Sequence, residues 1–155
     1  VQSLTNEELA AIYRGETLNW QKVGGEDATI SVGIRETTSG TRKAFDTLVL
    51  GGENPSAPES KTLMTNGDVA ALVKDDPNAI GYVGFGYLQE GLNAVTIDGV
   101  EPTQGSAMNS SYPLMHPLQL LTGPLTQPTA ETFITFALSE DGQAVVSESG
   151  WIPAQ

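Results

Sequence analysis

The chain has 155 residues, of which 39% are hydrophobic and 17% are charged, so it can bury one core and is too apolar for a disordered segment. Seven basic against 19 acidic residues give a net charge of −12, and no cysteine is present. This acidic balance disfavours nucleic acid and anionic membranes as partners, and the lack of cysteine excludes disulfides and thiolate metal sites.

The first third of the chain alternates helix and strand signals. Thr5 precedes two acidic residues and then apolar residues at helical spacing, so we expect a short helix that Thr5 caps and Gly15 ends. The alternating run 29–34 predicts a strand that leads into Arg35. Residues 42–50 carry apolar side chains at helical spacing and predict a second helix.

The rest of the chain continues this alternation. Residues 51–61 hold two prolines and two glycines and predict an exposed loop, after which Asn66 is expected to cap a helix that ends near Asp75. Two helices are expected near the C-terminus. The other expected elements are strands at 79–83, 94–97 and 118–122 and a short helix over 102–108. This order predicts an α/β sandwich of three layers, a mixed sheet with helices on both faces.

The strand end and the turn after it have the chemistry of an oxyanion site. Ser39 or Thr41 can cap the following helix, whose first N–H groups lack partners and whose dipole favours an anion. Gly40 allows close approach of the backbone, and Arg35 offers a planar fork of donors. The alternative is an ordinary helix cap beside an arginine that pairs with a carboxylate such as Glu36.

Arg42 and the glycines at 81, 84 and 86 are weaker candidates. Arg42 lies in the first turn of the expected helix, where a cation opposes the dipole, so it needs a compensating contact with either the anion or a carboxylate. The spacing of the three glycines does not match a dinucleotide fingerprint, and close packing of a strand is favoured.

An enzyme is disfavoured. A nucleophilic Ser39 would need a base and an orienting acid, and His116, the only histidine, is far along the chain. Carboxylate pairs such as Asp75-Asp76 are typical of helix ends and solvated faces rather than metal sites. No catalytic residue, metal or cofactor is therefore predicted.

Several ordered motifs resemble the substrate-binding proteins of phosphate ABC transporters. They are Leu4 to Glu16 with Asn19-Trp20 and Val23-Gly24-Gly25, Arg35 with Ser39-Gly40-Thr41-Arg42 and Phe45, Asn78 to Tyr87, Tyr112-Pro113-Leu114 with Pro117-Leu118, and Leu138 to Gln143 with Gly150 to Pro153. The resemblance implies one lobe of a type II periplasmic binding protein fold, an extracytoplasmic location, binding of inorganic phosphate, and permease subunits as partners. It also implies that Arg35, Ser39, Gly40 and Thr41 are phosphate ligands, with Arg42 as a secondary one.

The same resemblance implies that this chain carries half of a site. Residues 1–111 look like the second lobe, and 112–155 look like a return segment with C-terminal helices that would pack on the first lobe. Most of that first lobe is missing, so we expect weak phosphate binding unless the first lobe or a second copy of the chain completes the site. The alternatives are a stand-alone, dimeric scaffold or sensor domain, and another tetrahedral ligand such as sulfate, molybdate or tungstate.

Overall fold

Short strands form two small sheets in this computed structural model, which describes residues 1–88 and 90–154. The first sheet pairs β1 (Ser3–Leu4) with β5 (Thr96–Ile97). The second places β2 (Ser31–Arg35) between β3 (Lys61–Leu63) and β4 (Ala79–Ile80). β2 is therefore the central strand, and it carries the predicted oxyanion motif at its C-terminal end.

Each strand pair in the described residues is parallel, so the chain returns to the sheet through helices. α2 (Gly40–Val49) leads from β2 to β3, and α3 (Asn66–Asp75) leads from β3 to β4. The register places Arg35 opposite Leu63, which brings the end of β2 beside the start of α3. The expected sheet is mixed, with both parallel and antiparallel pairs. In the described part of the chain, antiparallel pairing occurs only as isolated bridges, so both sheets are parallel.

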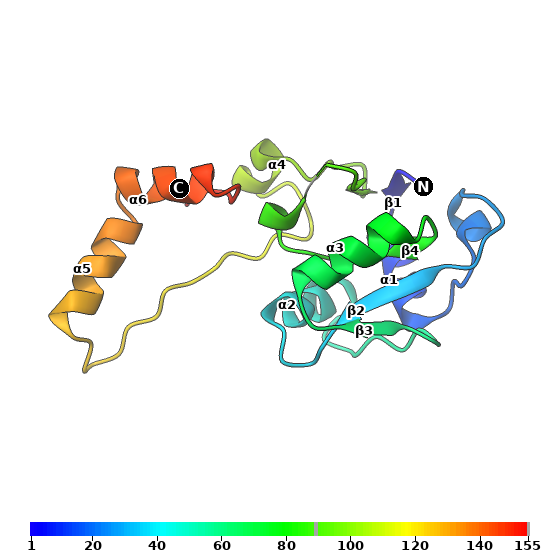
Figure 1. Ribbon diagram of the computed structural model, residues 1–155, viewed down its shortest axis with the longest axis horizontal. Helices are drawn as coiled ribbons and strands as arrows, with labels where there is room; N and C mark the ends of the chain where they lie inside the picture. Colours follow the sequence, from blue (N-terminus) through cyan, green and yellow to red (C-terminus); the bar gives the residue numbers. More distant parts are fainter. Residues whose placement is uncertain (89, 155) are drawn as a thin grey trace.

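The hydrophobic core lies between β2, α1 (Asn6–Arg14) and α2. Val32 and Ile34 join this core, whereas Gly33 faces α3, since a Cβ at Gly33 would meet the Leu72 side chain at 2.8 Å. Helices therefore cover both faces of β2, as Figure 1 shows. The predicted α/β class is confirmed.

The helix ends follow local capping rules. Thr5 caps α1 in a capping box, and Gly15 ends it in the left-handed region at φ 76°. The expectation that Asn66 caps α3 is wrong by one residue. Thr65 is the cap: its hydroxyl accepts from the Asp68 N–H at 3.1 Å, and the Asp68 carboxylate accepts from the Thr65 N–H at 2.9 Å.

Three expected strands and one expected loop differ from the structure. The strands expected at 79–83 and 94–97 shorten to β4 and β5, and Lys61, expected as the last residue of the loop, instead begins β3. The strand expected at 118–122 is absent: Leu118 and Leu121 are 85% and 86% exposed, and no neighbouring strand pairs with this described segment. An apolar run without a partner strand cannot satisfy its backbone as a sheet.

The remaining short elements are helical. They are η1 (Trp20–Val23), η2 (Phe85–Tyr87), α4 (Gln104–Met108), α5 (Pro128–Ala137) and α6 (Glu140–Glu148). Asn19 caps η1, and the Trp20 indole N–H donates to the Asn78 carbonyl at 2.9 Å. Asn19 and Trp20 thus form a structural turn that packs the indole.

The glycines at 81, 84 and 86 serve packing. A Cβ at Gly81 would meet the Val69 side chain at 2.3 Å, and a Cβ at Gly86 would meet the Trp151 indole at 2.7 Å. A Cβ at Gly84 would meet the same indole at 2.9 Å. The expected close packing is confirmed, but not within a strand, because all three glycines follow β4. Through Gly84 and Gly86, Trp151 near the C-terminus packs on the segment after β4.

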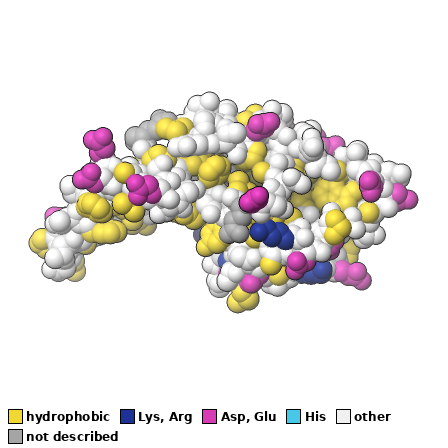
Figure 2. Space-filling view, turned by 45° about the horizontal axis from the view of Figure 1, so that its top comes forward, with side chains coloured by type: hydrophobic (Ala, Val, Ile, Leu, Met, Phe, Trp, Pro, Cys, Tyr) yellow, Lys and Arg dark blue, Asp and Glu magenta, His cyan; other side chains and the backbone are white. Residues whose placement is uncertain are grey.

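Residues 115–154, here called the C-terminal arm, extend away from the sheets and carry α5 and α6 (Figure 1). Figure 2 shows hydrophobic side chains on its surface, at the left of the view. The exposed large hydrophobic residues of the arm are Met115, Leu118, Leu120, Leu121, Leu125, Phe133, Phe136, Leu138, Val145 and Trp151. Gln155, the last residue of the predicted return segment, lies outside the described residues.

Candidate anion-binding site

The site begins where β2 ends and α2 starts. Ser39 is the N-cap of α2: its hydroxyl oxygen accepts from the Arg42 N–H at 3.3 Å, and the residue is 7% exposed. Thr41, the other candidate cap, lies inside the helix. The cap satisfies one orphan donor of the first turn and leaves the donors at 40 and 41 without a capping side chain.

The N–H groups of Gly40 and Thr41 are open donors. Among the described residues, neither N–H makes a hydrogen bond with the chain. A Cβ at Gly40 would meet no atom within 4 Å. The start of α2 therefore presents two backbone donors, and the positive end of the helix dipole, to open space.

Arg35 is held in place by neutral acceptors. Its Nη1 donates to the Asn66 amide oxygen at 2.8 Å, and its Nη2 donates to the Met64 carbonyl at 2.8 Å. Its backbone N–H donates to the Tyr82 hydroxyl at 3.1 Å. The residue is 8% exposed, and its buried Nε has no hydrogen-bond partner in the described part of the chain.

Glu36 closes the turn between Arg35 and Ser39. Its carboxylate accepts from the Thr38 N–H at 2.6 Å and from the Thr38 hydroxyl, and its carbonyl accepts from the Ser39 N–H at 3.1 Å. The hydrogen bond from the Thr38 hydroxyl, with the Thr38 N–H and the Arg35 charge, lowers the pKa of Glu36 below its ordinary value against the opposing effect of burial. The predicted pairing of Arg35 with Glu36 exists, but at 3.7 Å it is the longest contact of this guanidinium.

Arg42 contacts the chain rather than an open surface. Its Nε lies 3.1 Å from the Asp46 carboxylate, its Nη1 donates to the Arg35 carbonyl at 2.9 Å, and its Nη2 donates to the Asn54 amide oxygen at 3.2 Å. Of the two expected contacts, the structure has the carboxylate. Arg42 thus links α2 to the end of β2 through its hydrogen bond to the Arg35 carbonyl.

A small hollow lies next to Arg42, along one side of α2. Its volume is about 220 Å³, and it is lined by Thr37, Arg42, Lys43, Asp46, Thr47, Gly52 and Asn54. Asp46 contributes a carboxylate to it, so the hollow is less suited to an anion than the open donors of Gly40 and Thr41.

Aromatic side chains pack against the strand end and the helix that carry the motif. The Tyr82 ring stacks on Phe45 of α2 with a centroid distance of 4.1 Å, and Phe45 lies 4.5 Å from Tyr13. Burial raises the pKa of the Tyr82 hydroxyl, so it is neutral and accepts the Arg35 N–H at ordinary pH. Tyr82 therefore joins the strand that carries Arg35 to the helix that carries Gly40 and Thr41.

Sequence reasoning did not find Asn66, Met64 or the hydroxyl of Tyr82 as partners of Arg35. The only available signal was positional: parallel pairing of 61–63 with 33–35 would bring residue 64 to the end of β2, but β3 itself was not expected. His116, the lone histidine, is exposed and lies outside this group of residues.

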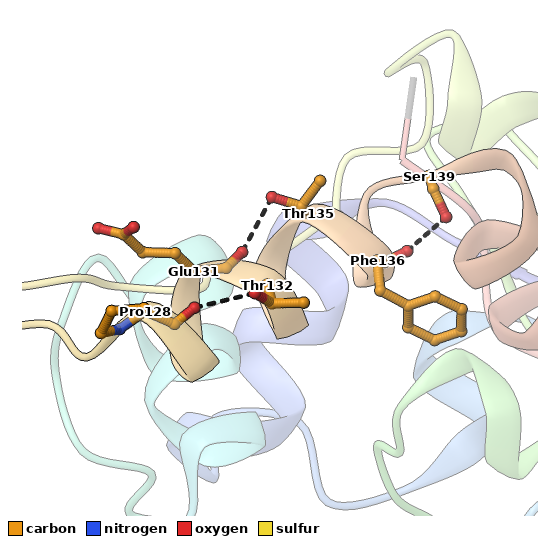
Figure 3. A pocket seen from close by; sticks show the side chains of 6 residues that line it. All are labelled: Pro128, Glu131, Thr132, Thr135, Phe136 and Ser139. Carbon is orange, nitrogen blue, oxygen red and sulfur yellow. Dashed lines mark hydrogen bonds between the residues drawn. The ribbon is translucent and has the colours of Figure 1, made fainter.

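A second hollow, of about 560 Å³, runs alongside α5 and is drawn in Figure 3. All of its lining residues come from 128–139, and the hydroxyls of Thr132 and Thr135 donate back to carbonyls of their own helix. Its only charged residue is Glu131. This hollow is lined by a single helical segment and carries a negative charge, so it is not suited to bind an anion.

Residues 1–141 match the PBP superfamily domain. The chain belongs to this family. The phosphate-binding protein PstS of Bacillus subtilis is 33% identical over 155 residues, which cover 99% of this chain and 51% of that protein. The PstS protein of Borreliella burgdorferi is 30% identical over 98% of this chain and 58% of its own length. This PBP superfamily chain thus spans about half the length of the curated relatives it matches.

Solved structures give the same result. A phosphate ABC transporter substrate-binding protein from Clostridium perfringens, solved with bound phosphate, has a TM-score of 0.85 and 34% identity, covering 100% of this chain and 64% of its own. A phosphate transport receptor from Vibrio cholerae has a TM-score of 0.82 and 29% identity, covering 99% and 65%. The resemblance predicted from the sequence is confirmed, as is the fold of part of a type II periplasmic binding protein. These relatives carry the names of binding and transport proteins, in agreement with a non-enzymatic role.

Within residues 1–88 and 90–154, no group of three or more histidine, aspartate or glutamate side chains could hold a metal ion. No helix of the same residues has the length and apolarity needed to cross a bilayer.

Proposed function

We propose that this chain binds inorganic phosphate reversibly at the end of β2 and the start of α2, as half of the ligand site of a transporter's substrate-binding protein. One observation carries the proposal: the buried Nε of Arg35 at the end of β2 has no acceptor in the described residues, and neither have the N–H groups of Gly40 and Thr41 at the start of α2. An unsatisfied buried donor costs about 1–3 kcal/mol, and more when it is charged. An oxyanion supplies the missing acceptor.

Each proposed ligand contributes a different interaction. Arg35 provides positive charge and a donor, Gly40 and Thr41 provide backbone N–H groups, and the hydroxyls of Ser39 and Thr41 provide further donors. These fixed donors replace the water shell of the ion. The net charge of −12 opposes approach, but salt screens exposed charges beyond about 8 Å, so local donors decide binding.

The second part of the proposal is that residues 1–111 form one lobe and 112–155 return to the other. Two observations support it: the relatives are nearly twice as long as this chain, and the C-terminal arm exposes apolar side chains such as Phe133 and Phe136. A first lobe would cover these side chains and close over the anion by a hinge motion. In that setting the protein works outside the cytoplasm and delivers phosphate to permease subunits.

Isothermal titration of the 155-residue chain with phosphate tests the site. We expect saturable binding with a dissociation constant well above the micromolar range, because only half of the donors are present. Arg35→Lys keeps the charge but loses the fork, so it should weaken binding about tenfold or more. Arg14→Lys is the matched control, since Arg14 lies at the surface with a 3.4 Å contact to Glu53.

Each result has a clear meaning. Equal affinities of wild type and Arg35→Lys would show that the guanidinium fork of Arg35 does not contribute to binding, and the absence of saturable binding would remove the function. Micromolar or tighter binding by a monomer would contradict the half-site. Sulfate, molybdate and tungstate present the same tetrahedral oxygens, so competition against phosphate identifies the preferred anion.

A further inference from the structure

We propose that Asn66 is a positioning residue. Its neutral amide orients the Arg35 guanidinium toward the anion without neutralising the positive charge of the arginine. The inference rests on the proposed function and names a residue outside the strand-to-helix motif. Its basis is the 2.8 Å hydrogen bond from Arg35 Nη1 to the Asn66 amide oxygen, in a guanidinium whose Nε stays without a partner in the described residues.

The position of Asn66 is fixed by its surroundings. Asn66 is the first residue of α3, directly after Thr65, whose capping box with Asp68 fixes the helix start. The pairing of Leu63 with Arg35 then places the following carbonyl, that of Met64, 2.8 Å from Arg35 Nη2. Two acceptors from one short connection thus hold the two terminal nitrogens of the guanidinium, and its Nε is the nitrogen left without a partner in the described residues.

The neutrality of these acceptors matters for anion binding. An amide and a backbone carbonyl orient a guanidinium without cancelling its charge. The neighbouring carboxylate of Glu36 lies farther away, at 3.7 Å, and already accepts two hydrogen bonds from Thr38. A carboxylate at position 66 would keep the acceptor oxygen and place a negative charge next to the ligand.

A simple helix-capping role does not account for the Asn66 side chain. Thr65 already caps α3, and the chain contains a close parallel at α1, where Asn6 is the first helical residue after a capping Thr5. The Asn6 side-chain amide donates to the Leu48 carbonyl at 3.4 Å, and in residues 1–88 and 90–154 it makes no hydrogen bond with an arginine. Asn6 is therefore the matched control position.

The experiment follows the side-chain Nε–H resonance of Arg35 by ¹H–¹⁵N NMR while the 155-residue chain is titrated with inorganic phosphate at constant ionic strength. The chain has only Arg14, Arg35 and Arg42, so Arg→Lys variants assign the three signals. The variants are Asn66→Ala and Asn66→Asp, with Asn6→Ala and Asn6→Asp as controls. Asn66→Asp keeps an acceptor for Nη1, so it also serves if Asn66→Ala fails to fold.

In the wild type we expect a saturable shift of the Arg35 signal. Both Asn66 variants should reduce its initial slope against phosphate concentration about tenfold, as expected for loss of one charge-assisted interaction, with both Asn6 variants unchanged. An unchanged thermal midpoint in Asn66→Asp would separate this effect from folding.

The opposite outcomes are distinguishable. If the wild-type signal does not respond to phosphate, the proposed function fails and this inference fails with it. If the wild type responds and the Asn66 variants respond equally, only the role of Asn66 is overturned. A normal response of Asn66→Asp beside a weakened Asn66→Ala would overturn the requirement for a neutral acceptor.

Discussion

Gly40 is the first residue of α2, and neither its backbone nor its neighbours require a glycine. Its φ lies outside the left-handed region, and a Cβ would meet no atom of the chain within 4 Å. Glycine at a helical position lowers stability by about 0.5–1 kcal/mol relative to alanine. In the proposed site, the anion approaches the backbone closely at this position, and that is the reason we assign to the glycine.

Gly40→Ala should therefore separate stability from binding. We expect the free energy of unfolding to stay the same or rise by up to about 1 kcal/mol, while phosphate binding weakens because the methyl group occupies the space of the ion. Thermal unfolding and titration calorimetry measure the two effects. Gly123→Ala, at another position where a Cβ would meet nothing, is the control. Unchanged binding in Gly40→Ala would place the anion away from this helix start.

At the scale of elements, β2 and α2 are joined by one side chain from the segment after β4. Tyr82 stacks on Phe45 of α2 and accepts the N–H of Arg35 at the end of β2. The distance between the arginine and the open donors of the helix thus depends on packing in the core. This arrangement gives the two halves of the motif a common support.

Tyr82→Phe should destabilise the chain by about 1–3 kcal/mol, because the ring can still stack but a buried N–H loses its acceptor. For a protein of this size the midpoint should fall by about 2–4 °C for each kcal/mol. Tyr87→Phe is the control, since Tyr87 contacts Trp151 edge-on at 6.2 Å. Equal midpoints for the two variants would show that the hydroxyl of Tyr82 contributes nothing.

At the scale of the whole molecule, the core and the arm differ in how they are held. The buried core residues lie between Leu4 and Ala107, whereas the arm returns to the body where Trp151 covers Gly84 and Gly86. Exposed apolar surface of this kind favours association with another surface. The first lobe is the partner that the proposed function assigns to it.

A chain shortened to residues 1–114 should keep its fold and its weak phosphate binding, since the motif and its supports all lie before residue 83. The full chain should self-associate more strongly at high concentration, because only it has the apolar arm. Circular dichroism, titration and analytical ultracentrifugation test these points. Unfolding of the shortened chain would mean that the arm stabilises the lobe, in contradiction to the division proposed at residues 111 and 112.

Features that depend on neighbouring residues could be predicted from the sequence alone. Capping patterns and apolar periodicity predicted α1, α2 and α3 to within a few residues, and the run from Arg35 to Thr41 predicted an anion site because caps, dipoles and hydroxyls act locally. Strand pairing is not local. The missing strand at 118–122 and the unexpected β3 both follow from whether a partner strand lies beside the segment.

The partners of Arg35 depend on the tertiary fold. Arg42 pairs with Asp46 one helical turn away, a local contact of the kind expected from the sequence. Arg35, in contrast, is held by Met64, Asn66 and Tyr82, which lie 29 or more positions away along the chain. The parallel register and the packing of Tyr82 on α2 bring these groups together, and no local pattern encodes such contacts. The donors of the candidate site thus lie in a short stretch of sequence. Their geometry is set by residues that are distant in the sequence and become neighbours in the folded chain.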